Sequence, residues 1–388
     1  MFKSKTILSQ MQSIISGYDF KNVVSEHNGD KGIKMFSTKN LLSVMLCVHM
    51  ASKQSLRDIV DSLQSKDSLW YHLGLKSLSR NNLSHSLKNR PNEIFEKTFY
   101  ALLTRLQNER SLTKDKRFKF KMPVRSIDST TISLCLSLFD WAEFRKKKGG
   151  IKLHVMYNNK DQIPEVVNFS NARKHDITIA DTFPIVENSI YVFDKGYIHF
   201  GFLEKINKNK AFFVTRTKSN TRYRIIERHP KTRNEIKADW TVSFSSYKSK
   251  DYPEQLRIVK YYDEETGKTY EFMTNNFTLS ARTIADIYKS RWDIELFFKW
   301  IKQNLRIKTF IGTSENAVKI QIWTAMIAYL LTEYIRFKSK TSFTILKTFR
   351  ILSENVLSQV EIDQLLNKKS PPIGKQMNLG DFQLGFSF

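Results

Sequence analysis

The segment Tyr288–Lys302, with the sequence YKSRWDIELFFKWIK, decides how the rest of the chain is interpreted. On an α-helix with about 100° per residue, four polar side chains share one narrow stripe: Tyr288, Arg291, Glu295 and Lys302. Beside the stripe lies an apolar band that would dock the helix on a core: Ile287, Ile294, Phe297, Phe298, Ile301 and Leu305. A carboxylate in line with a phenol, a guanidinium and an ammonium suits a metal-bound phosphate backbone. An amphipathic helix with ordinary ion pairs on a solvated face satisfies the same pattern.

Two aspartates upstream each follow an apolar run with the composition of a β-strand. Asp128 follows PVRSI, and Asp194 follows SIYVF and precedes a Lys-Gly turn. Strand ends are where α/β sheets place their chemistry, so both carboxylates are candidates for the same site as Glu295. An aspartate in this position is also a common cap or turn former.

Short β-rich runs from Met122 onward alternate with helical runs, which predicts an α/β fold with a mixed sheet. Four more strand-like runs follow, RYRII, WTVSFSS, QLRIVKYY and TYEFMT, and they predict a separate small antiparallel sheet inserted into the α/β unit. The spacing supports an insertion. The two aspartates are 66 residues apart, whereas Asp194 and Glu295 are 101 residues apart, which is more than one strand and one loop would use. The predicted units are the two parts of the α/β domain (122–217 and 277–310), the inserted β domain (218–276), and a helical C-terminal region with an irregular tail (311–388).

Residues 1–110 predict a helical N-terminal domain, because they contain few Gly or Pro and carry leucines at helical spacing. Within them, Ser79 can cap a helix whose apolar side contains Leu83 and Leu87. As the second helix of a helix-turn-helix, it would present polar side chains to DNA: Arg80, Asn81, Asn82, Ser84, His85 and Lys88. A plain helical bundle satisfies the same pattern, so both interpretations stay open.

The charge of the chain indicates a polyanionic partner. Its 388 residues include 63 Lys and Arg against 38 Asp and Glu, a formal net charge of +25. Such an imbalance is most often found in proteins that bind nucleic acid, although a merely basic surface also produces it. Two cysteines exclude a disulfide framework and a cysteine-rich zinc site. We expect a cytoplasmic protein, because the N-terminus lacks a signal-peptide core and Ile320–Ile335 is too short and polar for a membrane span.

With these motifs in place, the chain resembles the bacterial cut-and-paste DDE transposases of the insertion-sequence-four group over nearly its whole length. The resemblance rests on IDST at Asp128, KLHV at 152–155, KHD at 174–176, VFDKGY around Asp194 and FFVTRTK at 212–218. The family's spaced Tyr, Arg, Glu and Lys signature is met in full by Tyr288, Arg291, Glu295 and Lys302. The N-terminal part resembles the extra domain attached to one branch of these enzymes. Lys195 departs from the Arg that the family often has, but keeps its charge.

The resemblance implies a ribonuclease-H-like catalytic core, interrupted by the all-β insertion, in which Asp128, Asp194 and Glu295 are catalytic and bind metal. The implied cofactor is a pair of Mg²⁺ ions, with Mn²⁺ as a substitute. Three carboxylates supply the oxygen ligands that Mg²⁺ prefers, and two such ions activate the attacking oxygen and stabilise the leaving one.

The implied activity is a series of phosphoryl transfers. Water nicks the transposon end, the freed 3′-OH attacks the opposite strand to give a hairpin, the hairpin is opened, and the 3′-OH joins target DNA. Tyr288, Arg291 and Lys302 resemble residues that hold the phosphates of the transposon end. The family also stacks a flipped base on an aromatic of the β insertion. Trp240 is the candidate here, and a buried sheet tryptophan is the alternative.

The implied partners are double-stranded DNA, both transposon ends and target, and a second copy of the chain in a homodimeric synaptic complex. The implied location is the bacterial cytoplasm, in association with the nucleoid, with no membrane contact. A non-catalytic DNA-binding regulator derived from a transposase is the rival hypothesis. The three intact acidic positions favour the enzyme.

Overall fold

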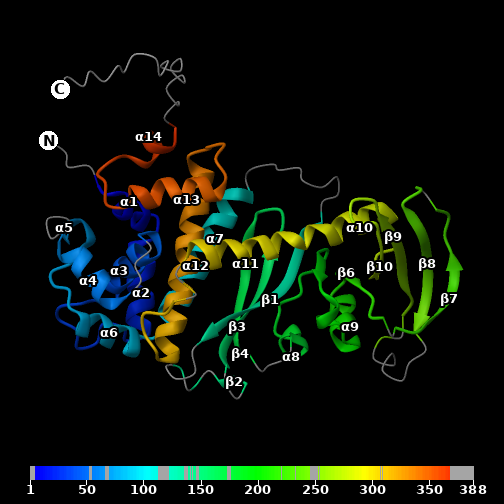
Figure 1. Cartoon of the computed structure of the whole chain (residues 1–388), viewed down its shortest axis with the longest axis horizontal. Helices are drawn as coiled ribbons and strands as arrows, with labels where there is room; N and C mark the ends of the chain where they lie inside the picture. The colour runs from blue at the N-terminus through cyan, green and yellow to red at the C-terminus, as the bar shows by residue number, and fades with distance from the viewer. Residues whose placement is uncertain are drawn as a thin grey trace, which may run out of the picture.

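A computed structural model shows an elongated molecule, with a long sheet toward one end and a bundle of helices at the other (Figure 1). The structure describes residues 5–51, 55–65, 70–111, 122–134, 139, 141, 143–145, 148–172, 176–219, 221–231, 233–244, 252, 254–305, 307 and 309–367. The first two residues of the KHD motif and the predicted irregular tail lie outside the described residues.

Five strands form the α/β part of the sheet: β1 (Val124–Leu134), β3 (Lys148–Asn158), β4 (Ile163–Asn171), β5 (Ile190–Phe193) and β6 (Phe212–Arg216). β4, β3 and β1 are antiparallel neighbours in that order. On the other side of β1, β5 and β6 run parallel to it. The short β2 (Glu143–Arg145) pairs with one end of β3. This mixed sheet confirms the predicted α/β class.

The strands of the predicted insertion extend the same sheet. They are β7 (Tyr223–Arg228), β8 (Ile236–Phe244), β9 (Leu256–Asp263) and β10 (Lys268–Thr274), each antiparallel to the next. β10 also pairs with β6, so the prediction of a separate small sheet was wrong. The physical reason is that β6 would otherwise present an unpaired edge, and β10 satisfies its backbone groups.

Helices cover both faces of the sheet. α8 (Asp176–Ala180), the short 3₁₀ helix η3 (Lys195–Tyr197) and α9 (Phe200–Lys208) lie on one face. α10 (Ala281–Ser290) and α11 (Trp292–Asn304) form a long rod across the other face (Figure 1). The four residues of β5 are all buried, because alternate side chains pack toward α9 and toward α10.

The N-terminal and C-terminal helices share one hydrophobic core. They are α1 (Ile7–Ser13), α2 (Gly17–Glu26), α3 (Thr38–Met50), α4 (Leu56–Gln64), α5 (Trp70–Leu73), α6 (Arg80–Asn89), α7 (Glu93–Ser111), α12 (Glu315–Lys338), α13 (Ile345–Glu354) and α14 (Ile362–Leu366). α12 contacts α3, α6, α7 and α13, and its Ile320–Ile335 segment is buried as predicted. Of the helices in the described ranges, none is long and apolar enough to cross a membrane.

The segment Tyr288–Lys302 forms two helices where the sequence predicts one. Arg291 lies between α10 and α11 with a helical backbone conformation. Its N–H donates to the Tyr288 carbonyl (3.1 Å), and its carbonyl accepts from the Ile294 N–H (3.2 Å). This is the spacing of a tighter turn, so the polar stripe is divided at Arg291. All six residues of the predicted apolar band are buried.

Candidate active site

Asp128 and Asp194 lie at the end of the parallel pairing between β1 and β5. The register between β1 and β5 ends with Ile127 opposite Phe193, and the next residue in each strand is one of the two aspartates. β1 itself continues to Leu134 in a ladder with β3. The prediction that Asp128 ends its strand was therefore wrong, because only the parallel pairing ends there. Asp194 follows β5 and begins the turn of η3.

Arg291 links Glu295 to the first of these aspartates. Its Nη1 donates to Asp128 Oδ2 (2.8 Å) and its Nη2 donates to Glu295 Oε1 (2.5 Å). The side chains of Arg291 and Asp128 are 14% and 19% exposed, and that of Glu295 is 34% exposed. In this partly desolvated setting, one guanidinium holds a carboxylate of the sheet and a carboxylate of α11 together.

Burial and neighbouring charges shift the pKa of the Asp128 carboxyl. Burial raises the pKa of the Asp128 carboxyl to about 6. The Ser129 N–H and Arg291 act to lower this pKa, whereas the negative charges of Glu295 and Asp194 raise it. Three carboxylates beside one guanidinium leave negative charge that Arg291 alone does not offset, which favours the binding of a further cation.

The donor chemistry of the site suits Mg²⁺, which prefers carboxylate oxygens. Within the part of the chain that the structure describes, no three His, Cys, Asp or Glu side chains gather closely enough to hold a metal ion. The guanidinium of Arg291 lies between the carboxylates of Asp128 and Glu295. Shared metal binding would therefore require these two carboxylates to turn from the guanidinium toward the ion.

Tyr288 lies on the α10 side of the site. Its ring packs against Phe272 of β10 (4.8 Å between centroids), and the Arg291 guanidinium lies 5.8 Å from the ring centre. Burial raises the pKa of its phenol, Arg291 lowers it, and the charge of Asp194 raises it. The phenol therefore lies within electrostatic reach of the second aspartate.

Lys302 lies near the far end of α11. Its Nζ donates to the backbone carbonyl of Thr131 (3.0 Å), three residues beyond Asp128 in β1. The structure thus brings the four residues of the signature onto the side of α10 and α11 that meets the strands of the two aspartates.

Asn159 is a residue at this site that sequence reasoning missed. It is fully buried, and its Oδ1 accepts both the N–H and the hydroxyl of Ser126 (3.0 and 2.9 Å). Its Nδ2 donates to the Ser290 carbonyl (2.5 Å) and to Asp293 Oδ2 (3.2 Å). It therefore ties β1 to the helix junction on both sides of Arg291. A single asparagine after an apolar run carries no sequence signal for this role.

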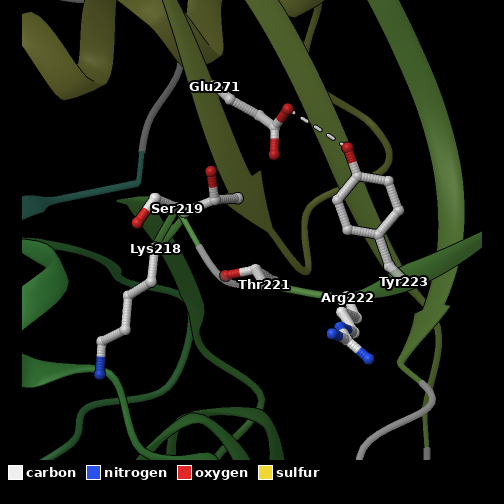
Figure 2. A pocket seen from close by; sticks show the side chains of 7 residues that line it. Lys218, Ser219, Thr221, Arg222, Tyr223 and Glu271 are labelled. Atoms are coloured by element: carbon white, nitrogen blue, oxygen red, sulfur yellow. Dashed lines mark hydrogen bonds between the residues drawn. The ribbon is translucent and has the colours of Figure 1, made fainter.

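A polar pocket of about 400 Å³ lies just beyond the end of β6. Because β6 pairs in parallel with β5, its end lies next to Asp194 at the same edge of the sheet. Figure 2 shows the Glu271 carboxylate accepting from the Tyr223 hydroxyl at one side, while Lys218 and Arg222 extend from the loop on the other. Lys218 Nζ also donates to the Ile198 carbonyl (3.1 Å). In the sequence, the FFVTRTK motif at 212–218 reaches this pocket at Lys218, but nothing in the motif predicts a pocket.

The predicted recognition helix exists as α6. Ser79 caps it by accepting the Asn82 N–H (3.1 Å), while Leu83 and Leu87 are buried. Its predicted DNA-facing side chains are all exposed: Arg80, Asn81, Asn82, Ser84, His85 and Lys88. The outward polar face is therefore present, at the helical end of the molecule.

Trp240 lies in β8, four strands away from β5 in the sheet. At a strand spacing of about 4.8 Å, this corresponds to roughly 19 Å from the edge where Asp194 lies. The indole is half-buried, and the cations of Arg228 and Lys260 lie 5.5 and 5.0 Å from its ring centres. Within this chain, Trp240 is not brought to the three acidic residues.

The fold and the site together define an α/β protein with an aspartate after each of two paired parallel strands and a glutamate on a helix that covers them. Residues 119–331, more than half of the chain, match the family described as the transposase DDE domain. The chain belongs to this family. Residues 3–76 match a domain of unknown function, DUF4372. The resemblance to bacterial DDE transposases with an added N-terminal domain is thereby confirmed.

Named relatives agree with this family. The putative transposase y4zB of Sinorhizobium fredii is 32% identical over 316 residues, which cover 79% of this chain and 85% of the relative. The probable transposase for insertion sequence element IS5377 of Geobacillus stearothermophilus is 26% identical over 354 residues, 90% of each chain. A cryo-EM structure of the piggyBac transposase synaptic complex with hairpin DNA aligns with 95% of this chain and 83% of that one, at 10% identity and a TM-score of 0.46.

Proposed function

We propose that this protein is a DNA transposase that binds transposon ends, cleaves them through a hairpin intermediate and joins the 3′-OH to target DNA. The observations that support this most are the adjacent positions of Asp128 and Asp194 on paired strands and the link that Arg291 makes between Asp128 and Glu295, in a chain of the transposase DDE family. Phosphoryl transfer needs little covalent participation by protein groups, so positioned charges of this kind can supply most of the catalysis.

We further propose that the catalytic core is ribonuclease-H-like. The support is the strand order β4-β3-β1-β5-β6, in which the first three strands are antiparallel and the last two run parallel to β1. Both aspartates then leave the central pair of strands, and Glu295 comes from a helix on one face. The inserted strands separate the second aspartate from that helix in sequence but not in space.

In this proposal Asp128, Asp194 and Glu295 would hold two Mg²⁺ ions, which activate an attacking oxygen and stabilise a leaving one. Arg291, Tyr288 and Lys302 bind the phosphates of the transposon end and hold the scissile phosphate beside the carboxylates. The attacking oxygen comes from water in the first cut and in hairpin opening, and from the freed 3′-OH in hairpin formation and strand transfer. In each step the attacking oxygen loses a proton and forms one P–O bond, the bond from phosphorus to a 3′ oxygen breaks, and the departing 3′ oxygen takes a proton.

The remaining surfaces support binding of a long DNA. The net charge of +25 favours the phosphate backbone, and Lys218 and Arg222 at the polar pocket extend the basic surface beyond Asp194. We propose that Arg80, Asn81, Asn82 and Lys88 contact the transposon end, that two copies of the chain act in one synaptic complex, and that Trp240 contacts DNA away from the metals. The protein would act in the cytoplasm at the nucleoid.

The experiment is incubation of the purified chain and Mg²⁺ with duplexes carrying the inverted repeats that flank its gene, followed by denaturing electrophoresis. A transposase gives nicked and hairpin products, and a joined product when target DNA is added. The rival hypothesis, a non-catalytic regulator derived from a transposase, predicts specific binding of the same duplexes with no cleavage in Mg²⁺ or Mn²⁺.

A further inference from the structure

One carboxylate beside the candidate site has no role in the function proposed above. Asp176 begins α8, on the face of the sheet opposite α11, and is the described residue of the KHD motif. Its Oδ1 receives the Ser129 hydroxyl (2.7 Å), Lys152 Nζ (2.8 Å) and, at a longer 3.4 Å, the Tyr197 hydroxyl. His154 Nδ1 lies 3.5 Å from the same oxygen.

Two of these donors belong to the segments that carry the aspartates. Ser129 follows Asp128 directly, and its N–H donates to Asp128 Oδ1 (2.8 Å). Tyr197 closes the turn after Asp194, because its N–H donates to the Asp194 carbonyl (3.0 Å). One oxygen of Asp176 is therefore hydrogen-bonded to a residue of each segment that carries an aspartate. Tyr197 is itself buried, so this connection has little freedom to move.

The Lys152 ammonium fixes Asp176 as an anion. Lys152 and His154 are two residues apart in β3, so their side chains point to the same face of the sheet as each other. β3 is the neighbour of β1 and pairs His154 with Ser129. The side chain of Lys152 is only 15% exposed, and His154 is fully buried. Burial would raise the pKa of Asp176, but the bonds from Lys152 and Ser129 hold it below its usual range.

We propose that Asp176 is a positioning residue that sets the placement of Asp128 relative to Asp194, with Lys152 neutralising it. This inference rests on the proposed function, because it assigns Asp176 to the support of the same carboxylate site. Groups that orient metal ligands from behind typically change metal affinity by about 10- to 100-fold when they are lost. Asp176 itself would touch neither DNA nor metal.

The test is a titration of the full chain with Mn²⁺. Binding is measured as the loss of the electron paramagnetic resonance signal of the free ion, and thermal melting is measured on the same samples. Asp128→Asn identifies the binding that belongs to the site. Asp176→Asn should weaken that binding by about 10-fold or more at temperatures where melting shows the variant to be fully folded, although it melts lower because Lys152 loses its charge partner. The matched control is Asp181→Asn, because Asp181 follows the same helix but its side chain is 59% exposed.

Ser129→Ala provides a second variant that removes the hydroxyl and keeps the backbone N–H. It should weaken Mn²⁺ binding too, and the double variant Asp176→Asn/Ser129→Ala should be no weaker than Asp176→Asn, since both changes break one connection. Unchanged Mn²⁺ affinity in Asp176→Asn, or fully additive losses in the double variant, would overturn the inference. If Asp176→Asn fails to fold, unchanged affinity in Ser129→Ala overturns it instead. If Asp128→Asn binds Mn²⁺ as tightly as the unsubstituted chain, the proposed metal site is refuted, and the role of Asp176 is refuted with it.

Discussion

At the scale of single residues, Arg291 is the cation that pairs with the acidic residues of the site. It pairs directly with Asp128 and Glu295 and lies beside the ring of Tyr288, while Asp194 adds a further negative charge. The sequence identifies these residues because acidity, spacing and family signature are all local features. It does not predict that Arg291 bridges two carboxylates, because that pairing depends on how α11 lies across β1.

We predict that Arg291→Ala lowers the steepness of the salt dependence of DNA-end binding by about 0.9 in log affinity per log salt, as expected for one lost phosphate contact. The rate of end cleavage at saturating DNA should also fall, by about 100-fold, because the scissile phosphate is positioned less well. The measurements are titrations at several salt concentrations and single-turnover cleavage.

Arg282→Ala is the matched control for this prediction. Arg282 lies on α10, which ends next to Arg291, and it too pairs with two acids, Glu235 and Asp286, away from the aspartates. The Arg282→Ala variant should have a slightly lower melting temperature. Its salt dependence of DNA-end binding and its cleavage rate should be unchanged. If Arg291→Ala behaves in the same way as Arg282→Ala, then Arg291 forms only structural ion pairs.

At the scale of elements, the junction between α10 and α11 positions the site. The periodicity predicts the buried band correctly, because burial of an apolar face follows from sequence spacing. The break at Arg291 has no such signal, since no Pro or Gly marks it. Asn159, which is distant in sequence, donates to Ser290 and Asp293 on either side of it. The strand continuation of β1 past Asp128 is likewise determined by pairing with β3.

Asn159→Ala should lower the free energy of unfolding by about 1–3 kcal/mol, because it leaves buried polar partners on Ser126 and Ser290 unsatisfied. Cleavage should also slow at temperatures where the variant is fully folded, because the junction around Arg291 loses its link to β1. Chemical denaturation and cleavage kinetics measure the two effects. The control is Asn168→Ala on β4, which removes one hydrogen bond to Thr182. Equal effects in both variants would contradict a specific role for the junction.

The exposed face of α6 gives a second prediction at this scale. Replacing Asn81 and Asn82 together by Ala should reduce the preference for transposon ends over random duplex and leave stability nearly unchanged, because both side chains are exposed. A competition gel-shift assay measures the preference. Lys97→Ala on α7 is the control for a general loss of surface groups. Unchanged preference in the Asn variant would leave α6 as part of a plain helical bundle.

At the scale of the whole molecule, the N-terminal helices are integrated with the C-terminal ones. The His49 ring is hydrogen-bonded to Thr324 of α12 (3.0 Å), and Asn316 donates to the carbonyls of Leu87 and Arg90 at the end of α6 (3.0 and 2.7 Å). Composition predicts a helical N-terminal region correctly. The shared core is a contact between distant segments, which local patterns do not encode.

We therefore predict that a chain beginning after residue 111 does not fold stably, because it exposes the faces of α12 that α3, α6 and α7 cover. Circular dichroism and size-exclusion chromatography should show a destabilised, aggregating product. A monomeric truncated chain with a cooperative melting transition would contradict this prediction and would establish the N-terminal region as an independent domain.

The central claim is that Asp128, Asp194 and Glu295 form one metal-dependent site for DNA cleavage, and Asp194→Asn tests it most directly. This change removes a charge that metal binding would need and leaves the proposed phosphate contacts in place. With purified full-length chain, Mg²⁺ and duplexes bearing the flanking inverted repeats, we expect end binding close to that of the unsubstituted chain and no detectable nicking or hairpin product. Cleavage by Asp194→Asn at the rate of the unsubstituted chain would contradict the account.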